Sequence, residues 1–191
     1  MATIANISDL TQQTQDLGIT LPIHEDLSVL AAPVPVGPLT APNALAIHPM
    51  EGADGTTDGA PGELTLRRYD RFASGGAGLL WAEAIAVAPE ARANPRQLWL
   101  HAGTADSIAA MVERIFKVAS APAGPNHRPV LVAQLTHSGR YSRPVAKPAP
   151  IIVQHCPQRD AAAKIPADMP VAADGYLARL PDAFAIAARL A

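Results

Sequence analysis

Short apolar runs alternate with amphipathic segments through the middle of the chain, and this alternation limits the fold most strongly. The runs lie at 44–47, 77–83 and 129–133, and the amphipathic segments lie at 61–74 and 104–120. The runs have the composition of strands that are buried on both faces, whereas the segments repeat their apolar residues at helical spacing. The order strand, helix, strand, helix, strand is typical of βα units around a parallel sheet. We therefore expect an α/β fold.

The segment 61–74 shows the clearest helical pattern. Its apolar residues recur on one face, and Gly75–Gly76 is a typical helix end. Three basic residues fall largely on the opposite face, which predicts that they are solvated: Arg67, Arg68 and Arg71.

The flanking segments are rich in proline, which is about twice as frequent as its usual 5% share. We expect a single domain over 1–191, with a loosely ordered arm at 1–33 and a proline-rich insertion at 142–178. A short hairpin is expected over 34–45, where the prolines exclude a central strand. Within the insertion, the residues at 150–153 fit a short strand. A third helix is expected from Leu180 to Leu190, with Pro181 and Asp182 in its first turn.

Composition excludes several classes of protein. A net charge of −2 provides neither a basic stripe for nucleic acid nor a polybasic membrane patch. Cys156 is the only cysteine, so an internal disulfide framework is excluded. No signal peptide is readable, and no apolar run approaches the ~18 residues that span a bilayer. A soluble cytoplasmic protein is expected.

Polar residues follow the third apolar run, over 134–140. In parallel α/β folds, ligands bind at the carboxyl ends of the strands. Gln134 carries both an amide donor and a carbonyl acceptor, which suits the edge of a planar heterocycle. The alternative is a polar strand end that only caps a turn.

Further short motifs accompany this one in a fixed order and spacing. They are Ile47-His48-Pro49-Met50-Glu51-Gly52, Asp58-Gly59 with Glu63, Gly76-Ala77-Gly78-Leu79, Ala82-Glu83-Ala84 with Val87, and Gln134-Leu135-Thr136-His137-Ser138-Gly139-Arg140. Together, over roughly 34–145, they resemble the old yellow enzyme family of FMN-dependent NADH:flavin oxidoreductases and ene-reductases. The resemblance is greatest to the branch with bacterial enoate and 2,4-dienoyl-CoA reductases.

The resemblance implies a TIM barrel with FMN at the carboxyl ends of the strands. Here the barrel would be an incomplete N-terminal portion of about three βα units, because a closed barrel needs eight. It also implies a ping-pong reaction in which NADH or NADPH reduces the flavin. Hydride then passes from flavin N5 to an activated carbon–carbon double bond of a small-molecule substrate.

The resemblance also assigns cofactor-binding residues. Pro49 and Met50 match backbone that lies along the isoalloxazine, and Ala84 matches a small residue near the ring edge. Gln134 matches the glutamine that hydrogen-bonds the pyrimidine part. Glu51 falls beside the N5–C4 carbonyl edge, where relatives often have threonine or cysteine. An ionised carboxylate there would disfavour the anionic reduced flavin, which predicts a lowered flavin potential or a protonated Glu51.

Two more residues of the last motif, His137 and Arg140, are expected near substrate or cofactor. The catalytic residues of the family are not found in this sequence. A His-His or His-Asn pair, a tyrosine proton donor and a phosphate-binding region with arginine and glycine are all expected beyond Ala191.

Two other functions remain open. One is an inactive remnant or interaction module that keeps the half-barrel, whose exposed edge would favour homo-oligomers. The other is a different TIM-barrel hydrolase or aldolase, which is disfavoured because no metal cluster or lysine base follows a strand. His155–Cys156 has no second pair at zinc spacing, so no metal site is expected. Glu83 is expected to be a structural ion-pair partner, whereas Arg92 and Asn94 fit either a substrate contact or a solvated loop.

Overall fold

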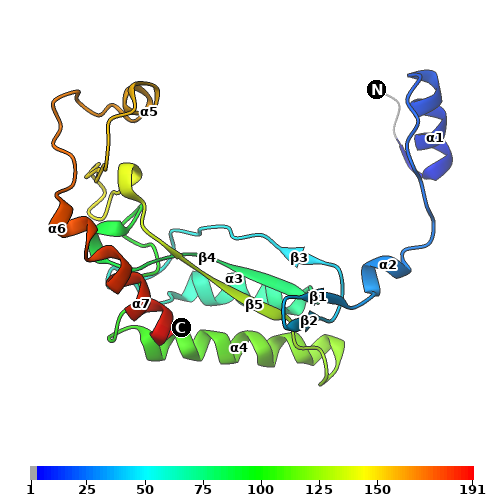
Figure 1. Ribbon diagram of the computed structural model, residues 1–191. Coiled ribbons are helices and arrows are strands. Elements are labelled where there is room, and N and C mark those ends of the chain that lie inside the picture. The colour runs from blue at the N-terminus through cyan, green and yellow to red at the C-terminus, as the bar shows by residue number, and fades with distance from the viewer. Residues whose placement is uncertain (1–3) are drawn as a thin grey trace.

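A three-stranded parallel sheet forms the centre of the computed structural model, which describes residues 4–191 (Figure 1). Its order is β3 (Ala46–Ile47), β4 (Leu79–Ala86) and β5 (Val130–Thr136). Helix α3 (Glu63–Ser74) connects β3 to β4, and α4 (Ala105–Ala123) connects β4 to β5. The predicted alternation of strands and helices is therefore confirmed.

Local chemistry accounts for both ends of α3, whereas α4 continues past its predicted end. In α3, Glu63 in the first turn and Arg71 in the last turn match the helix dipole, and Gly75 ends the helix. In α4, the hydroxyl of Thr104 donates to the carbonyl of Trp99 at 2.6 Å just before the first turn. This helix continues to Ala123, beyond the amphipathic segment predicted at 104–120.

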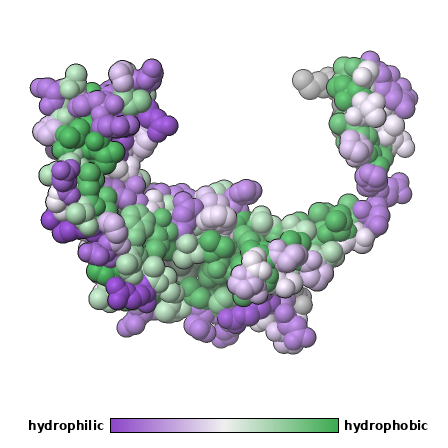
Figure 2. All heavy atoms as spheres, viewed as in Figure 1, coloured by the Kyte–Doolittle hydropathy of each residue, from purple (hydrophilic) through white to green (hydrophobic). Residues whose placement is uncertain are grey.

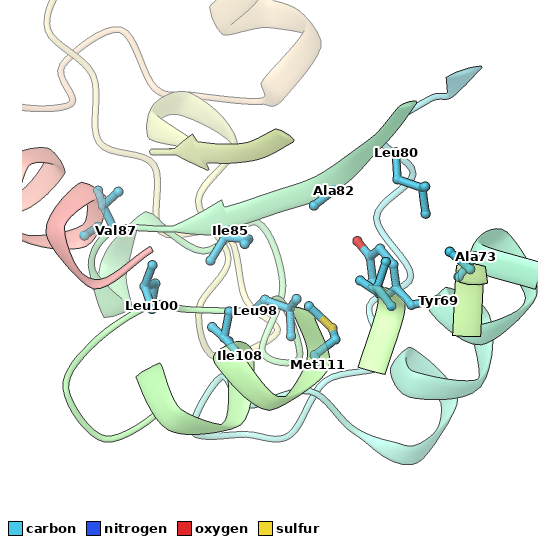
Figure 3. Close-up of a cluster of buried hydrophobic side chains, with 13 residues drawn as sticks. Tyr69, Ala73, Leu80, Ala82, Ile85, Val87, Leu98, Leu100, Ile108 and Met111 are labelled. Atoms are coloured by element: carbon cyan, nitrogen blue, oxygen red, sulfur yellow. The ribbon is translucent and has the colours of Figure 1, made fainter. Parts of the chain in front are cut away.

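The two helices cover one face of the sheet and form the core with it. Leu80 and Ile85 of β4 pack with Tyr69 of α3 and Met111 of α4 (Figure 3). Ile115 of α4 belongs to the same cluster. All five are at most 2% exposed. Burial of these side chains against the sheet is the main stabilising contribution to this part of the chain.

Within residues 4–191, the opposite face of the sheet carries no helix (Figure 1). Because side chains alternate along a strand, the residues between the core positions point to this face. Trp81, which is paired with Val132 across the sheet, is 43% exposed there. The sheet is thus buried on one face and open on the other, and residues 4–191 do not form a closed barrel.

The N-terminal segment contains the predicted hairpin, made by β1 (Val34–Val36) and β2 (Leu39–Ala41). Within the arm expected to be loosely ordered at 1–33, α1 (Ile7–Asp16) and α2 (Ser28–Ala31) are helical, and residues 1–3 lie outside the described range. Helix α1 lies apart from the body of the molecule (Figure 1). Figure 2 shows hydrophobic atoms exposed on this arm.

Short elements surround the carboxyl ends of β4 and β5. These are η1 (Pro89–Ala91), η2 (Gly139–Tyr141), α5 (Pro157–Ala163) and α6 (Asp174–Leu177), and the chain ends with α7 (Leu180–Leu190). The predicted third helix is confirmed with its bounds, including Pro181 in its first turn.

The strand predicted at 150–153 is wrong. The amide of Ile151 donates to the carbonyl of Gly139 at 2.9 Å, and Ile152 is buried. The apolar run therefore packs on η2 as irregular chain rather than adding to the sheet.

Candidate functional site

Ala84 and Gln134 lie side by side on the open face of the sheet. They are direct partners in the parallel register of β4 and β5. Leu131 and Leu135 pack into the core, so Gln134 between them points to the opposite face. Within residues 4–191 the side-chain amide of Gln134 makes no hydrogen bond, which leaves its donor and acceptor free for a ligand or solvent.

The loop after β3 is tied to the end of β4 by its backbone. The amide of Gly52 donates to Oε2 of Glu83 at 3.3 Å, and Nη1 of Arg68 donates to the carbonyl of Met50 at 3.2 Å. Pro49 is half-buried, whereas the side chains of Met50 and Glu51 are exposed. The backbone of this loop therefore has a defined path beside β4.

The prediction that Arg68 lies on the solvated face of its helix is wrong. Its side chain is 19% exposed and pairs with Oδ1 of Asp54 at 2.9 Å and Oε1 of Glu83 at 2.6 Å. Burial alone would lower the pKa of Arg68, but the hydrogen bonds with Asp54 and Glu83 outweigh it and raise the pKa. Both carboxylates come from outside α3, so the helical pattern gave no sign of them. The expected ion-pair role of Glu83 is confirmed.

A β-bulge between Trp81 and Ala84 directs Glu83 out of the ladder. Its amide donates to the phenolic oxygen of Tyr69 at 2.8 Å, and its side chain is 1% exposed. Burial, and then the charge of Glu83, raises the pKa of Tyr69 to about 12.

The stability of the chain should therefore fall in alkali. Tyr69 stays neutral in the fold up to a pKa of about 12, above its ordinary value of 10.0, so its contribution is complete below pH 10 and is lost toward pH 12. A shift of this size corresponds to about 3 kcal/mol. Urea unfolding across this range should show the loss, with a smaller loss in Tyr69→Phe. An equal loss in both proteins would contradict the assignment, and exposed Tyr141→Phe is the control.

The loop after β4 adds two amide side chains. Asn94 donates to the carboxylate of Glu51, so the structure brings these two residues together. Partial desolvation of its carboxylate, and then the charge of Glu83, raises the pKa of Glu51, and the hydrogen bond from Asn94 partly opposes this rise. Gln97, which the sequence did not single out, is fully buried and donates to the carbonyl of Ala84 at 2.9 Å.

The solvated setting predicted as one alternative for Arg92 is wrong. The side chain is buried, and its guanidinium donates to the carbonyls of Pro89, Pro95 and Thr57 at 2.8 to 3.2 Å. It therefore holds the backbones of two loops together.

His137 belongs to a hydrogen-bonded chain at the end of β5. Its Nδ1 accepts from the amide of Gly139 at 3.0 Å, so we assign the proton to Nε2, which lies 2.6 Å from the hydroxyl of Tyr176. Tyr176 in turn donates to Glu90 at 3.2 Å. Burial lowers the pKa of His137. Burial, and then the charge of Glu90, raises the pKa of Tyr176 to about 12. Glu90 and Tyr176 are 86 positions apart, and no local sequence signal connects them.

Arg140 is engaged within the protein. It forms a largely buried ion pair with Asp160 and donates to the carbonyl of Gln154 at 2.9 Å. Asp160 also accepts from Nδ1 of His155 and from the amide of Cys156. These contacts hold α5 against η2. In the part of the chain that the structure describes, no three histidine, cysteine, aspartate or glutamate side chains are grouped as metal ligands.

The helices of the described residues also include none that is long and apolar enough to cross a membrane.

Known structures share the fold of this chain over most of its length. The chain superposes on an old yellow enzyme homologue from Zymomonas mobilis with a TM-score of 0.62 and 20% identity, covering 84% of this chain and 44% of the homologue. For old yellow enzyme from a Pichia species the TM-score is 0.64, with 19% identity over 85% of this chain and 42% of that enzyme. For 2-naphthoyl-CoA reductase in complex with 2-naphthoyl-CoA it is 0.69, with 14% identity over 85% of this chain and 25% of that enzyme.

No family model and no curated protein matches the sequence. The chain spans less than half the length of each of these three solved relatives. The structural matches confirm the predicted fold class and the resemblance at the level of the fold. The chain has the α/β fold of part of the old yellow enzyme TIM barrel, with a parallel sheet that is not closed within residues 4–191.

Proposed function

We propose that this chain is part of an FMN-dependent oxidoreductase of the old yellow enzyme type. The observation that carries the proposal is the unpartnered amide of Gln134 beside the small side chain of Ala84, on the open sheet face of this fold. When bound, FMN would pass hydride from NADH or NADPH through its N5 to an activated carbon–carbon double bond. The activity, the substrate class and the hydride donor belong to the proposal for the whole protein.

The residues that are present fit the flat isoalloxazine. Ala84 occupies little space above the sheet, and Gln134 offers a donor and an acceptor to the pyrimidine edge. The backbone of Pro49 and Met50 would line the ring. Arg68 holds this backbone in place through its hydrogen bond to the carbonyl of Met50. Glu51 would lie at the N5 edge, where an ionised carboxylate would repel the negative charge of the reduced ring. Partial burial and the charge of Glu83 raise the pKa of Glu51 from its ordinary value.

His137 and Arg140 have supporting roles in this proposal. The contacts of His137 with Tyr176 and of Arg140 with Asp160 fix the loops around the carboxyl end of β5. They would shape the rim of the site near substrate or cofactor. The His pair and the tyrosine proton donor of the family would come from another part of the barrel.

A flavin titration of the purified chain tests the proposal. FMN is expected to bind with a shifted visible spectrum, and NADH is expected to bleach it in the absence of oxygen. Gln134→Leu should weaken FMN binding about tenfold, because a hydrogen bond worth about 1.4 kcal/mol is lost. Gln154→Leu changes an exposed glutamine of the insertion and should bind like wild type. Flavin that stays free at micromolar concentrations, or equal affinities for all three proteins, would contradict this assignment.

The surface of the chain favours a second candidate, an interaction module without catalysis. The chain exposes 11905 Å², whereas a compact monomer of this mass exposes about 8,700 Å². Trp81 on the open sheet face and Leu17 on the arm are among the exposed apolar residues. A chain that leaves flavin free but elutes as a defined oligomer in light-scattering chromatography would support this candidate instead.

A further inference from the structure

One ion-paired group lies beneath the loop after β3, and we call it the Arg68 clamp. It consists of Asp54 from this loop, Arg68 from α3 and Glu83 from the bulge in β4. All three side chains are less than 20% exposed. The clamp joins three elements that are separate in the sequence.

All three guanidinium nitrogens of Arg68 donate hydrogen bonds. Nε and Nη2 donate to the two oxygens of Asp54 at 3.3 and 2.9 Å, and Nη2 also donates to Glu83 at 2.6 Å. Nη1 remains for the carbonyl of Met50 at 3.2 Å. A lysine would keep the charge, but it lacks the planar set of donors that these directions require.

The loop backbone fits tightly over the clamp. A Cβ atom at Gly52 would lie 2.4 Å from Nη2 of Arg68 and 2.6 Å from Oδ2 of Asp54. The amide of Gly52 meanwhile donates to the second oxygen of Glu83 at 3.3 Å. Two consecutive anchor points, the carbonyl of Met50 and the amide of Gly52, therefore flank Glu51.

We propose that Arg68 is a positioning residue for the flavin site: from the outer helix it fixes the backbone of Met50–Gly52 and neutralises Glu83 beside that backbone. The part that concerns flavin rests on the proposed function above. Without Arg68, the carboxylates of Asp54, Glu83 and Glu51 would share one corner of the site with no cation of the clamp between them. The loop would lose the Met50 anchor, and the ring edge would face more negative charge.

Amide hydrogen exchange of the chain without flavin tests the positioning directly. Arg68→Met is expected to speed exchange at Gly52 at least about tenfold, while the amides of β5 stay protected. Arg68→Lys should fall between this variant and wild type. Arg67→Met is the matched control, since Arg67 is the exposed neighbour in the same helix and forms no ion pair with another described residue. An exchange rate at Gly52 within twofold of wild type in Arg68→Met would overturn the proposal, as would equal rates in the two methionine variants.

A second variant keeps the test decisive if Arg68→Met does not fold. Gly52→Ala places a methyl group against Nη2 and should release the same loop. Faster exchange over 50–54, with protected β5 amides, is then the expected result. Unchanged exchange over 50–54 would overturn the proposal.

The flavin midpoint potential distinguishes positioning from a purely structural role. In a chain that binds FMN, Arg68→Met should weaken FMN binding at least about tenfold. It should also lower the potential, because the charge of Glu83 is no longer neutralised, and Arg68→Lys should restore most of the potential. Glu51→Gln should raise the potential, because a carboxylate beside N5 is removed. An unchanged potential in Arg68→Met would contradict the electrostatic part of the proposal. If the wild-type chain does not bind FMN, the proposed function fails while the exchange result still decides the clamp.

Discussion

Ala84→Leu is expected to reduce FMN binding by about 100-fold, equivalent to about 3 kcal/mol. Ala84 is the neighbour of Gln134 in the register of β4 and β5. A leucine at this position would fill the space above the sheet that the flat ring needs. No helix of the described residues 4–191 covers this face, so the larger side chain has room in the free chain and the fold should be retained.

The control for this substitution lies one residue before Gln134. Ala133 lines the small cavity beneath α4 with Ala82 and Ile85, so it points away from the open face. Ala133→Leu should leave FMN affinity close to that of wild type. Fluorescence titration of FMN against the three proteins measures the difference, and far-UV circular dichroism checks the fold. If Ala84→Leu binds FMN as tightly as Ala133→Leu, the ring does not lie over Ala84 and the site is wrong.

Ile115→Ala is expected to lower the free energy of unfolding by about 2 to 5 kcal/mol. Ile115 is 1% exposed and belongs to the core between α4 and the sheet. Its truncation removes buried apolar contacts and leaves a cavity that the packed neighbours only partly fill. Since domains are stable by only about 5 to 15 kcal/mol, this one change should remove a large share of the stability.

Ile186→Ala is the matched control for the core. Ile186 is an isoleucine on the exposed side of α7, with 55% of its surface accessible. Its truncation should change stability by about 0.5 kcal/mol or less. Urea unfolding followed by circular dichroism compares the two variants, which should share the denaturant slope of wild type. Similar losses for both would mean that the sheet and α4 do not form the main core.

The sequence identified the central elements because their signals are local. The helical spacing in 61–74 and the glycines after it gave α3, and the apolar run at 129–133 gave the first part of β5. The same reasoning failed at 150–153. Ile151 there donates to the backbone of η2 and Ile152 is buried, and composition alone does not distinguish such irregular chain from a strand.

The site was predictable only where parallel strands bring residues together. Because carboxyl ends of neighbouring parallel strands meet at one edge, Ala84 and Gln134 could be expected near each other. Tyr176, which donates to Glu90, and the buried Gln97 had no comparable signal. Their contacts depend on how loops fold back over the strand ends.

The sequence by itself determined the order and type of the central strands and helices, since periodicity and chain breakers act within a few residues of one another. Only the tertiary structure decided that one face of the sheet is open beside Gln134 within residues 4–191. It also decided that Arg68, expected on the solvent-exposed face of α3, pairs with Asp54 and Glu83. The physical reason is that a buried charge needs a partner of opposite sign, and that partner can come from any part of the chain that folding brings within hydrogen-bonding distance.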